Sequence, residues 1–265
     1  MLKKIKLILY INYFLIFQKK NWFRNYLLNK EKFTYLKNGS IHGDTYNVLD
    51  NLFNLSKSRL QRARKNTPFN NQTTRTKALT QVINIFQPDE IFETGTLLGN
   101  TTEFFGKFET KVTSVEISEL YYTVSKIRFF HKENVKIVHG DSSKILSDFL
   151  PNEKKILFYL DAHSHSREVI PLEKEIKHCL RFKNSLILID DFKVPNNIGF
   201  GFDSYHDVDL SIDNYPILKK YDLYFPNYDP KIDENNRGYV LVDPGGFLKN
   251  KLKEIFYLSI YEELN

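Results

Sequence analysis

Two glycines placed four positions apart, Gly95 and Gly99, are the first candidates for chemistry in this chain. They follow a short apolar run that contains Glu93, and they precede Asn100, where a helix is expected to begin. A strand that turns sharply into a helix through glycines leaves its backbone open to a nucleotide-sized ligand. This stretch, which includes Thr96, therefore predicts one wall of a cofactor site without identifying the cofactor.

Acidic residues stand at or just beyond the end of every early strand that the sequence predicts. They are Glu93, Glu116, Asp141, Asp161 and the pair Asp190–Asp191. Scattered acids would not be expected to fall so regularly. Ligands of open parallel sheets bind beyond the carboxyl ends of the strands, so these acids mark the functional edge of the sheet.

Two of these acids are placed to bind a nucleoside. Glu116 lies 21 residues after Gly95, and an acid at the end of the second strand, about 20 residues past a glycine turn, is placed to bind a ribose diol. The alternative is an ordinary strand-end carboxylate. Asp141 and Ser142 are placed to contact an adenine edge; equally, they would only cap the helix that follows.

The glycine pattern argues against a dinucleotide. The NAD fingerprint has three glycines, Gly-x-Gly-x-x-Gly, and rests the pyrophosphate on a helix N-terminus. This chain has only Gly95-x-x-x-Gly99, and Glu93 stands close to where the pyrophosphate would lie. Negative charge beside phosphate is unfavourable but suits a cationic ligand. S-adenosylmethionine carries an ammonium and a sulfonium group and no phosphate.

Asp161, Asp190 and Asp191 end two strands that are expected to be neighbours. Two like charges about 4 Å apart repel by roughly 4 kcal/mol at an effective dielectric near 20. Such a cluster needs a cation, or a raised pKa in one member. Oxygen-only ligands favour Mg²⁺ or Mn²⁺ (or Ca²⁺) over zinc. In the alternative interpretation, Asp191 caps the loop and the other two acids bind only the cofactor.

The ordered motifs resemble those of class I S-adenosylmethionine-dependent methyltransferases. The resemblance covers roughly residues 73–243. It rests on Glu93-x-Gly95-x-x-x-Gly99, Glu116, Gly140-Asp141 and Asp161. It implies that Gly95 and Gly99 approach the methionine part of the cofactor and that Glu116 binds the ribose. The complete set of cofactor-binding residues that we expect is Glu93, Gly95, Thr96, Gly99, Glu116, Asp141, Ser142 and Asp161.

An Asp after the fourth strand and an Asp-Asp pair after the fifth resemble metal-dependent small-molecule O-methyltransferases of the macrocin and catechol types. That resemblance implies Asp161, Asp190 and Asp191 as ligands of Mg²⁺ (or Mn²⁺). The metal would lower the pKa of an acceptor hydroxyl and orient it toward the methyl group.

The catalytic base departs from the family pattern. The family has a Lys or Asp just after the fourth strand, whereas this chain offers His163 and His165. Histidine suits the task because its pKa lies near neutral pH. The alternatives are a loop or packing role for these histidines, or a zinc site that they form with the aspartates.

Short apolar runs, which predict strands, alternate along the chain with stretches that predict helices. This alternation indicates βαβ units, which must position the candidate residues. We expect strands at 90–94, 111–117, 134–139, 155–160, 185–190, 221–226 and 237–242, and helices at 45–64, 73–86, 100–107, 118–132, 142–150, 168–182 and 247–263. The predicted fold is α/β: a doubly wound, mostly parallel seven-stranded sheet of the Rossmann-like methyltransferase type with an N-terminal helical extension. We divide the chain into a basic, apolar segment 1–44 and a methyltransferase domain 45–265.

The positive charge of the chain lies in its first 37 residues. They hold nine Lys/Arg and one acid, whereas the whole chain is +6, which leaves the remainder near −2. The body therefore has no nucleic-acid footprint. The apolar run 7–17 is too short to span a bilayer, which takes about 20 residues. We expect residues 1–37 either to make a peripheral contact with an anionic membrane surface or to pack on the domain or on a second subunit of a homo-oligomer. The single Cys179 fits a reducing compartment, so the expected location is cytoplasmic, peripheral on the inner face of the membrane.

The long loop after Asp191 is rich in glycine and aromatic residues. Residues 192–206 follow a strand at the functional edge and are expected to form a substrate lid. Their aromatic rings and polar groups suit a sugar or another polyol; the alternative is a packed surface loop. The leading functional hypothesis is an O-methyltransferase acting on a glycan or small hydroxylated metabolite. The alternatives are a catalytically inactive, membrane-recruited binding module of the same fold, or a different metal enzyme on this scaffold.

Overall fold

The computed structural model of the chain describes residues 67–129, 132–149, 153–163, 170–197, 199–233, 235–251 and 254–261. The N-terminal segment 1–44, the helix predicted at 45–64 and His165 lie outside these residues. Within the part that is described, none of the helices combines the length and the apolar character needed to cross a bilayer.

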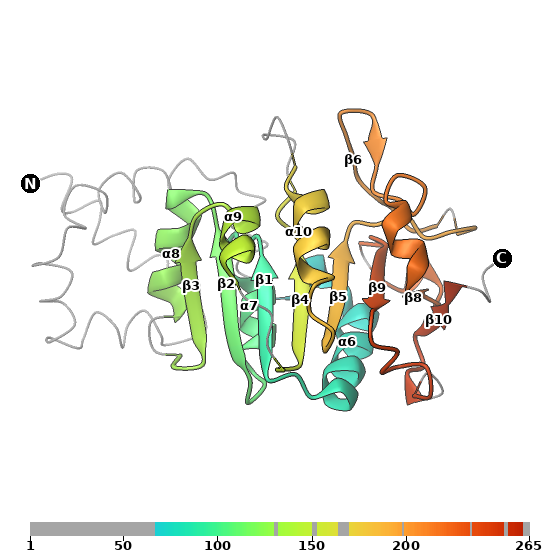
Figure 1. The fold of residues 1–265 in the computed structure, drawn as a ribbon, viewed down its shortest axis with the longest axis horizontal. Helices are drawn as coiled ribbons and strands as arrows, with labels where there is room; N and C mark the ends of the chain where they lie inside the picture. Colours follow the sequence, from blue (N-terminus) through green and yellow to red (C-terminus); the bar gives the residue numbers. More distant parts are fainter. Residues whose placement is uncertain are drawn as a thin grey trace, which may run out of the picture.

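An eight-stranded sheet forms the centre of the described chain (Figure 1). Its strands, in the order in which they stand side by side, are β10 (Leu258–Ile260), β8 (Asp222–Pro226), β9 (Tyr239–Asp243), β5 (Ser185–Asp190), β4 (Ile156–Leu160), β1 (Glu90–Thr94), β2 (Lys111–Glu116) and β3 (Val135–His139). β1 to β5 pair in parallel. β9 runs antiparallel between β5 and β8, and β10 runs antiparallel to β8. The mostly parallel, doubly wound sheet that the sequence predicts is confirmed, with one strand more than expected.

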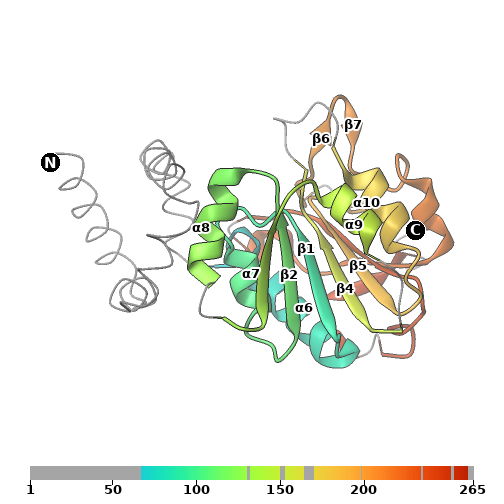
Figure 2. The same cartoon turned by 60° about the vertical axis from the view of Figure 1, so that its left-hand side comes forward.

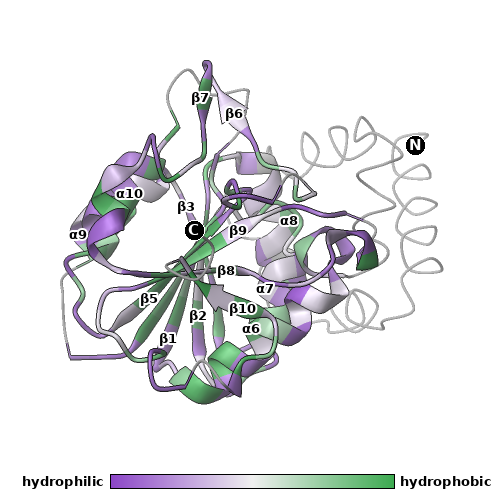
Figure 3. Ribbon diagram, turned by 90° about the vertical axis from the view of Figure 1, so that its right-hand side faces the viewer, coloured by the Kyte–Doolittle hydropathy of each residue, from purple (hydrophilic) through white to green (hydrophobic). Residues whose placement is uncertain are grey.

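Helices cover both faces of the sheet (Figures 2 and 3). One face carries α6 (Thr73–Phe86), α7 (Asn100–Phe105) and α8 (Glu119–Phe129), and the other carries α9 (Ser142–Asp148) and α10 (Leu172–Cys179). Each layer has its own apolar core, to which the two faces of the central strands contribute alternate side chains. The central strands are buried on both faces, which explains why they read as continuous apolar runs in the sequence.

The direction of winding reverses between β1 and β4. From β1 the chain continues to β2 and β3 on one side, and then returns to β4 and β5 on the other. Thr94 is in register with Leu160, and Leu160 with Ile189. The residues that follow these strands therefore emerge at one level, at the switch point where open α/β sheets bind ligands.

The helix predicted at 247–263 is wrong. Residues 258–260 form β10, which lies antiparallel against β8 at the edge of the sheet. The side chain of Asn227 also donates to Ser259 Oγ at 2.5 Å. Apolar residues such as Leu248, Ile255 and Leu258 are spaced as on a helix, but the unpaired edge of β8 offers the backbone hydrogen bonds that decide the outcome.

A distant carboxylate fixes the start of α6. The Asp233 side chain accepts hydrogen bonds from the backbone N–H groups of Thr73 at 2.8 Å and Thr74 at 3.1 Å. These are two of the donors that a helix N-terminus leaves unpaired, and negative charge is favourable there. Just before α6, the short helix η1 (Phe69–Asn71) has three successive residues with positive φ. It leads the chain to the functional edge of the sheet.

A small hairpin, β6 (Ser204–Tyr205) and β7 (Val208–Asp209), stands at the same edge, above β5 in Figure 1. The chain then passes through η2 (Pro216–Lys220) before β8 and through η3 (Pro230–Ile232) before β9.

Candidate functional site

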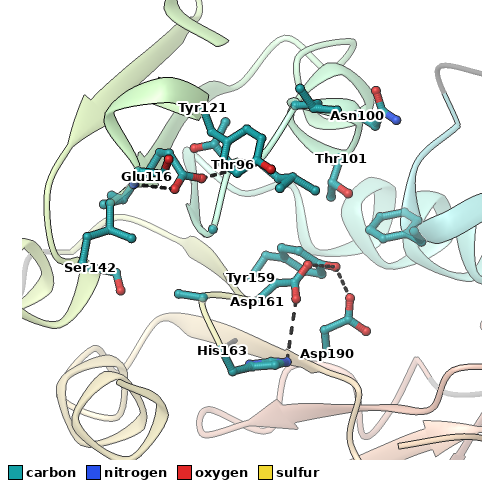
Figure 4. Close-up of a pocket in the computed structure, with 18 of the residues that line it drawn as sticks. Thr96, Asn100, Thr101, Glu116, Tyr121, Ser142, Tyr159, Asp161, His163 and Asp190 are labelled. Carbon is teal, nitrogen blue, oxygen red and sulfur yellow. Dashed lines mark hydrogen bonds and ion pairs between the residues drawn. The ribbon is translucent and has the colours of Figure 1, made fainter. Parts of the chain in front are cut away.

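A pocket of about 430 Å³ opens at the carboxyl ends of β1, β2, β4 and β5 (Figure 4). Its size is in the range of small-molecule sites. Five of the predicted cofactor-binding residues line it, namely Gly95, Thr96, Glu116, Ser142 and Asp161. The other three, Glu93, Gly99 and Asp141, do not. His163 and Asp190 line the pocket as well, together with Phe69 and Asn70 of η1.

The two glycines of the turn serve different purposes. Gly95 has a φ of +84°, and a Cβ added to it would lie 2.3 Å from the backbone oxygen of Asp161. Only glycine therefore lets the ends of β1 and β4 approach each other at the pocket. Gly99 has a φ of +75°, but its added Cβ would meet the ring of Phe129 at 2.4 Å. Gly99 accommodates the packing of α8, not the ligand that the sequence pattern assigns to it.

Glu93 lies behind the pocket wall and does not line the pocket. Its side chain is fully buried and accepts hydrogen bonds of 2.5 Å from the hydroxyls of Thr102 and Ser114. The Ser114 hydroxyl also contacts that of Thr96 at 2.6 Å. Glu93 is therefore linked through Ser114 to the glycine turn and helps to hold it in place. Burial raises the pKa of Glu93 to about 7, against the lowering effect of the two hydroxyl hydrogen bonds.

Replacing Glu93 by glutamine is expected to change how stability depends on pH. The folded protein holds the Glu93 proton up to about pH 7, whereas the unfolded chain releases it near 4.5. The wild type therefore loses about 3 kcal/mol of stability as pH rises between these values, and the variant does not. The free energies of unfolding in urea at pH 5 and pH 8 measure this, with exposed Glu109→Gln as the control. An equal pH dependence in Glu93→Gln and wild type would contradict the assignment.

Glu116 faces the pocket with acceptor capacity to spare. Its Oε2 accepts the backbone N–H of Leu97 at 2.7 Å, and its Oε1 accepts that of Ser118 at 2.8 Å. The two amides fix the carboxylate plane. Each carboxylate oxygen has two lone pairs, so each retains one for a hydroxyl donor. This geometry suits the vicinal diol of a ribose.

Asp141 caps the helix that follows it. Its Oδ1 accepts the backbone N–H of Ser143 at 3.0 Å and the hydroxyl of the same residue at 2.7 Å. This is the capping role that the sequence left open as the alternative to adenine contact. Ser142 is the member of the pair that lines the pocket.

A buried arginine holds Asp190, which the sequence assigns to a metal. Arg75 Nη1 lies 2.6 Å from Asp190 Oδ1, with side-chain exposures of 1% and 4%. The other oxygen accepts the hydroxyl of Tyr159. Burial opposes ionisation of Asp190, but the charge of Arg75 outweighs it and lowers the pKa of Asp190. Both carboxylate oxygens accept hydrogen bonds and Arg75 compensates the charge, so Asp190 is the least suited of the three aspartates to bind a cation, and its role as a metal ligand stays a prediction.

Three other side chains converge where the metal was expected. His163 Nε2 lies 3.7 Å from Asp161 Oδ1 and 3.8 Å from Asp191 Oδ2. One donor atom from each of the three residues lies within 4.8 Å of the others. Burial, followed by repulsion from Asp190 and Asp191, raises the pKa of Asp161 well above its usual range. The donor set is thus two carboxylates and one imidazole.

The loop at 192–206 is tied to the site through Arg237. Arg237 Nε donates to Asp191 Oδ1 at 2.6 Å, and its Nη2 pairs with Asp203. The Tyr205 hydroxyl donates to Asp203 at 2.8 Å, and the Tyr205 ring meets that of His163 edge-on. The loop therefore packs beside the histidine, and its role as a substrate lid stays a prediction.

Sequence reasoning missed the two arginines. Arg75 carries a detectable signal, because it falls on the buried face of α6 with Leu79 and Val82, four and seven positions later. A charge on an apolar helical face needs a buried partner. Arg237 carries no such signal, since it precedes β9 in a polar segment and meets Asp191 only through the fold.

No protein-family model and no curated protein matches the sequence. Solved structures do match it. The cofactor-bound protein Rv0187 from MTB is 16% identical to this chain. The alignment covers 70% of this chain and 87% of Rv0187, and the TM-score is 0.50. The O-methyltransferase from Bacillus cereus in complex with SAH is 16% identical over 70% and 88%, with a TM-score of 0.47. The SAH-bound methyltransferase PaMTH1 from Podospora anserina is 16% identical over 71% and 88%, with a TM-score of 0.46.

The likeness concerns the fold. At 16% identity and a TM-score of 0.50, the match to Rv0187, together with the strand order, confirms the predicted doubly wound, Rossmann-like α/β fold. The function has to be argued from the site, because one fold hosts many activities.

Proposed function

We propose that this protein is an S-adenosylmethionine-dependent O-methyltransferase. In this proposal the acceptor is a hydroxyl group of a sugar, glycan or small metabolite, and a divalent metal assists the reaction. Gly95, Thr96, Glu116, Ser142 and Asp161 bind the cofactor, and the acceptor hydroxyl binds near Asp161, His163 and Asp191.

The charge of the pocket wall is the observation that carries the proposal. The acids that line it are Glu116, Asp161 and Asp190, of which Asp190 is paired with the buried Arg75, and no Lys or Arg is among the described lining residues. A pyrophosphate needs cationic groups or a helix N-terminus free of nearby acids. A sulfonium and an ammonium group are instead attracted to this wall. The pocket therefore favours S-adenosylmethionine over a dinucleotide.

The chemistry requires an in-line approach. The acceptor oxygen forms a bond to the methyl carbon while the carbon–sulfur bond breaks, and the electron pair of that bond stays on sulfur. Holding the two reactants in line supplies much of the acceleration. The hydroxyl proton must leave. Without a metal ion, His163, the described basic side chain at this end of the pocket, would accept it. A metal ion held by Asp161, His163 and Asp191 would occupy the imidazole nitrogen; it would instead lower the pKa of the hydroxyl and orient it, and the proton would pass to solvent.

The loop at 192–206 and the neighbouring Arg237 support a polyol acceptor. Asp203, Tyr205 and Arg237 offer polar groups and one ring beside His163. Aromatic faces with neighbouring hydrogen-bonding groups suit the apolar and hydroxyl faces of a sugar ring.

Replacing Glu116 by glutamine is expected to weaken S-adenosylmethionine binding about tenfold to a hundredfold, because a hydrogen bond to a charged acceptor contributes about 1.5–3 kcal/mol. Titration calorimetry of the full chain with S-adenosylmethionine measures this. Glu119→Gln, an exposed acid at the start of α8, is the matched control.

Three outcomes bear on the proposal. Absence of S-adenosylmethionine binding by the wild type, or tighter binding of NADH, would overturn it. Binding of the cofactor without methyl transfer to any of a panel of sugars and catechols would instead favour the non-catalytic binding module.

A further inference from the structure

Asp161 and His163 at the acceptor end of the pocket, with Asp191 beside them, form a mixed donor set that the sequence offered only as an alternative, with zinc as its ion. We propose that Asp161, His163 and Asp191 form a mixed nitrogen–oxygen metal site that takes a first-row transition ion such as Mn²⁺ in preference to Mg²⁺. Its use in catalysis rests on the proposed function, whereas ion binding itself does not.

The positions of the donor atoms support a shared ion. Asp161 and His163 follow β4, and Asp191 follows β5, the next strand of the sheet. His163 Nε2 stands between the two carboxylates, at 3.7 and 3.8 Å. Ligands about 2.0–2.2 Å from one ion lie roughly 3–3.5 Å from each other. Small side-chain rotations therefore bring all three donors onto one ion.

The burial of His163 without hydrogen-bond partners indicates that its ring binds a ligand. Its side chain is 1% exposed, yet neither ring nitrogen has a hydrogen-bond partner among the described residues. Buried polar groups are rarely left unpaired, and each such case needs an explanation. Figure 4 shows the ring pointing toward the Asp161 carboxylate. An ion between these groups would satisfy the nitrogen and offset the repulsion between the aspartates.

Arg75 explains why nitrogen enters the donor set. The guanidinium occupies one oxygen of Asp190, and the hydroxyl of Tyr159 occupies the other. Because Arg75 compensates the charge of Asp190 and, with the backbone N–H of Asp191, fills both lone pairs of its Oδ1, Asp190 is the weakest cation ligand of the three aspartates. Imidazole is a ligand suited to zinc, iron and similar ions, whereas Mg²⁺ prefers carboxylate, carbonyl and water oxygens. Exchanging an oxygen ligand for His163 shifts the preference toward transition ions.

Arg237 holds the Asp191 carboxylate in place from the side away from His163. It binds Oδ1 of Asp191 and leaves Oδ2, the atom nearer His163, available. Outer hydrogen bonds of this kind orient a ligating carboxylate. Asp191 also has a φ of +52°, a strained backbone conformation that persists only with such support.

Manganese binding to the full chain tests the proposal without any acceptor. Electron paramagnetic resonance of a Mn²⁺ titration is expected to give one bound ion, with affinity at least about tenfold above that for competing Mg²⁺. Spin-echo modulation of the Mn²⁺-loaded wild type is expected to report a coordinated imidazole nitrogen. His163→Asp is expected to lose this signal and most of the preference over Mg²⁺, whereas His178→Asn, on α10, keeps both.

The outcomes separate this site from the cofactor proposal. Absence of Mn²⁺ binding, equal affinity for Mg²⁺, or no nitrogen coupling in the wild type would overturn the site even if S-adenosylmethionine binds. Manganese binding with nitrogen coupling in a protein that does not bind S-adenosylmethionine would support the site and overturn the proposed function. The wild-type spectrum keeps the test decisive if His163→Asp fails to fold.

Discussion

Arg75→Met is expected to lower the free energy of unfolding by about 3–5 kcal/mol at pH 7, because it strips a buried carboxylate of its partner. Asp190 would keep only the Tyr159 hydroxyl and its own loop backbone as donors. The guanidinium also lies 4.8 Å from the Phe69 ring and 4.6 Å from the Tyr239 ring, so its loss removes cation–π contacts as well. Urea denaturation followed by circular dichroism measures the change.

The pH dependence identifies the cause. Without Arg75, burial raises the pKa of Asp190 above its unfolded value, so the stability deficit of Arg75→Met grows as pH rises from 5 to 7. Arg181→Met, an exposed position, is the matched control. The double variant Arg75→Met/Asp190→Asn should recover part of the loss, since it removes the unpaired charge. A deficit that is the same at both pH values and additive in the double variant would indicate packing loss alone.

The order of elements could be predicted because each signal is local. The five parallel strands, of which 156–160 is the clearest, are short runs rich in apolar residues, and each ends near an acid. The predicted strands at 90–94 and 185–190 coincide with β1 and β5, and the others differ from the structure by one or two residues at an end. Parallel strands buried on both faces admit few other side chains, so sequence and structure agree there.

The partners of the acids could not be predicted, because they come from distant segments. Arg75 and Asp190 are 115 positions apart, and Asp233 and Thr74 are 159 apart. No pattern within a window of the sequence indicates which acid receives an arginine. The sequence therefore predicts three aspartates that repel one another and need a metal ion. In the structure, Arg75 and Arg237 already compensate part of that charge at Asp190 and Asp191.

Gly95→Ala is expected to weaken S-adenosylmethionine binding strongly and to destabilise the fold by about 2–5 kcal/mol, combining a positive-φ penalty with steric overlap. The obstructing atom is a backbone oxygen, that of Asp161, 2.3 Å from the added Cβ. Asp161 cannot retreat easily, because its own N–H donates to Thr94 at 3.1 Å across the paired strands. Relief must therefore come from displacing the turn or the end of β4, and both line the pocket.

Gly99→Ala is the matched control, because it imposes the same backbone strain at a φ of +75° without touching the pocket wall. Its Cβ meets the side chain of Phe129, a ring that can rotate aside at some cost in packing. We expect Gly99→Ala to lose stability and keep its affinity for S-adenosylmethionine, and Gly95→Ala to lose both. Calorimetric titration at a temperature where circular dichroism shows both variants folded makes the comparison. Unchanged cofactor affinity in folded Gly95→Ala would place the ligand away from this turn, and an equal loss of affinity in Gly99→Ala would mean that strain alone accounts for the effect.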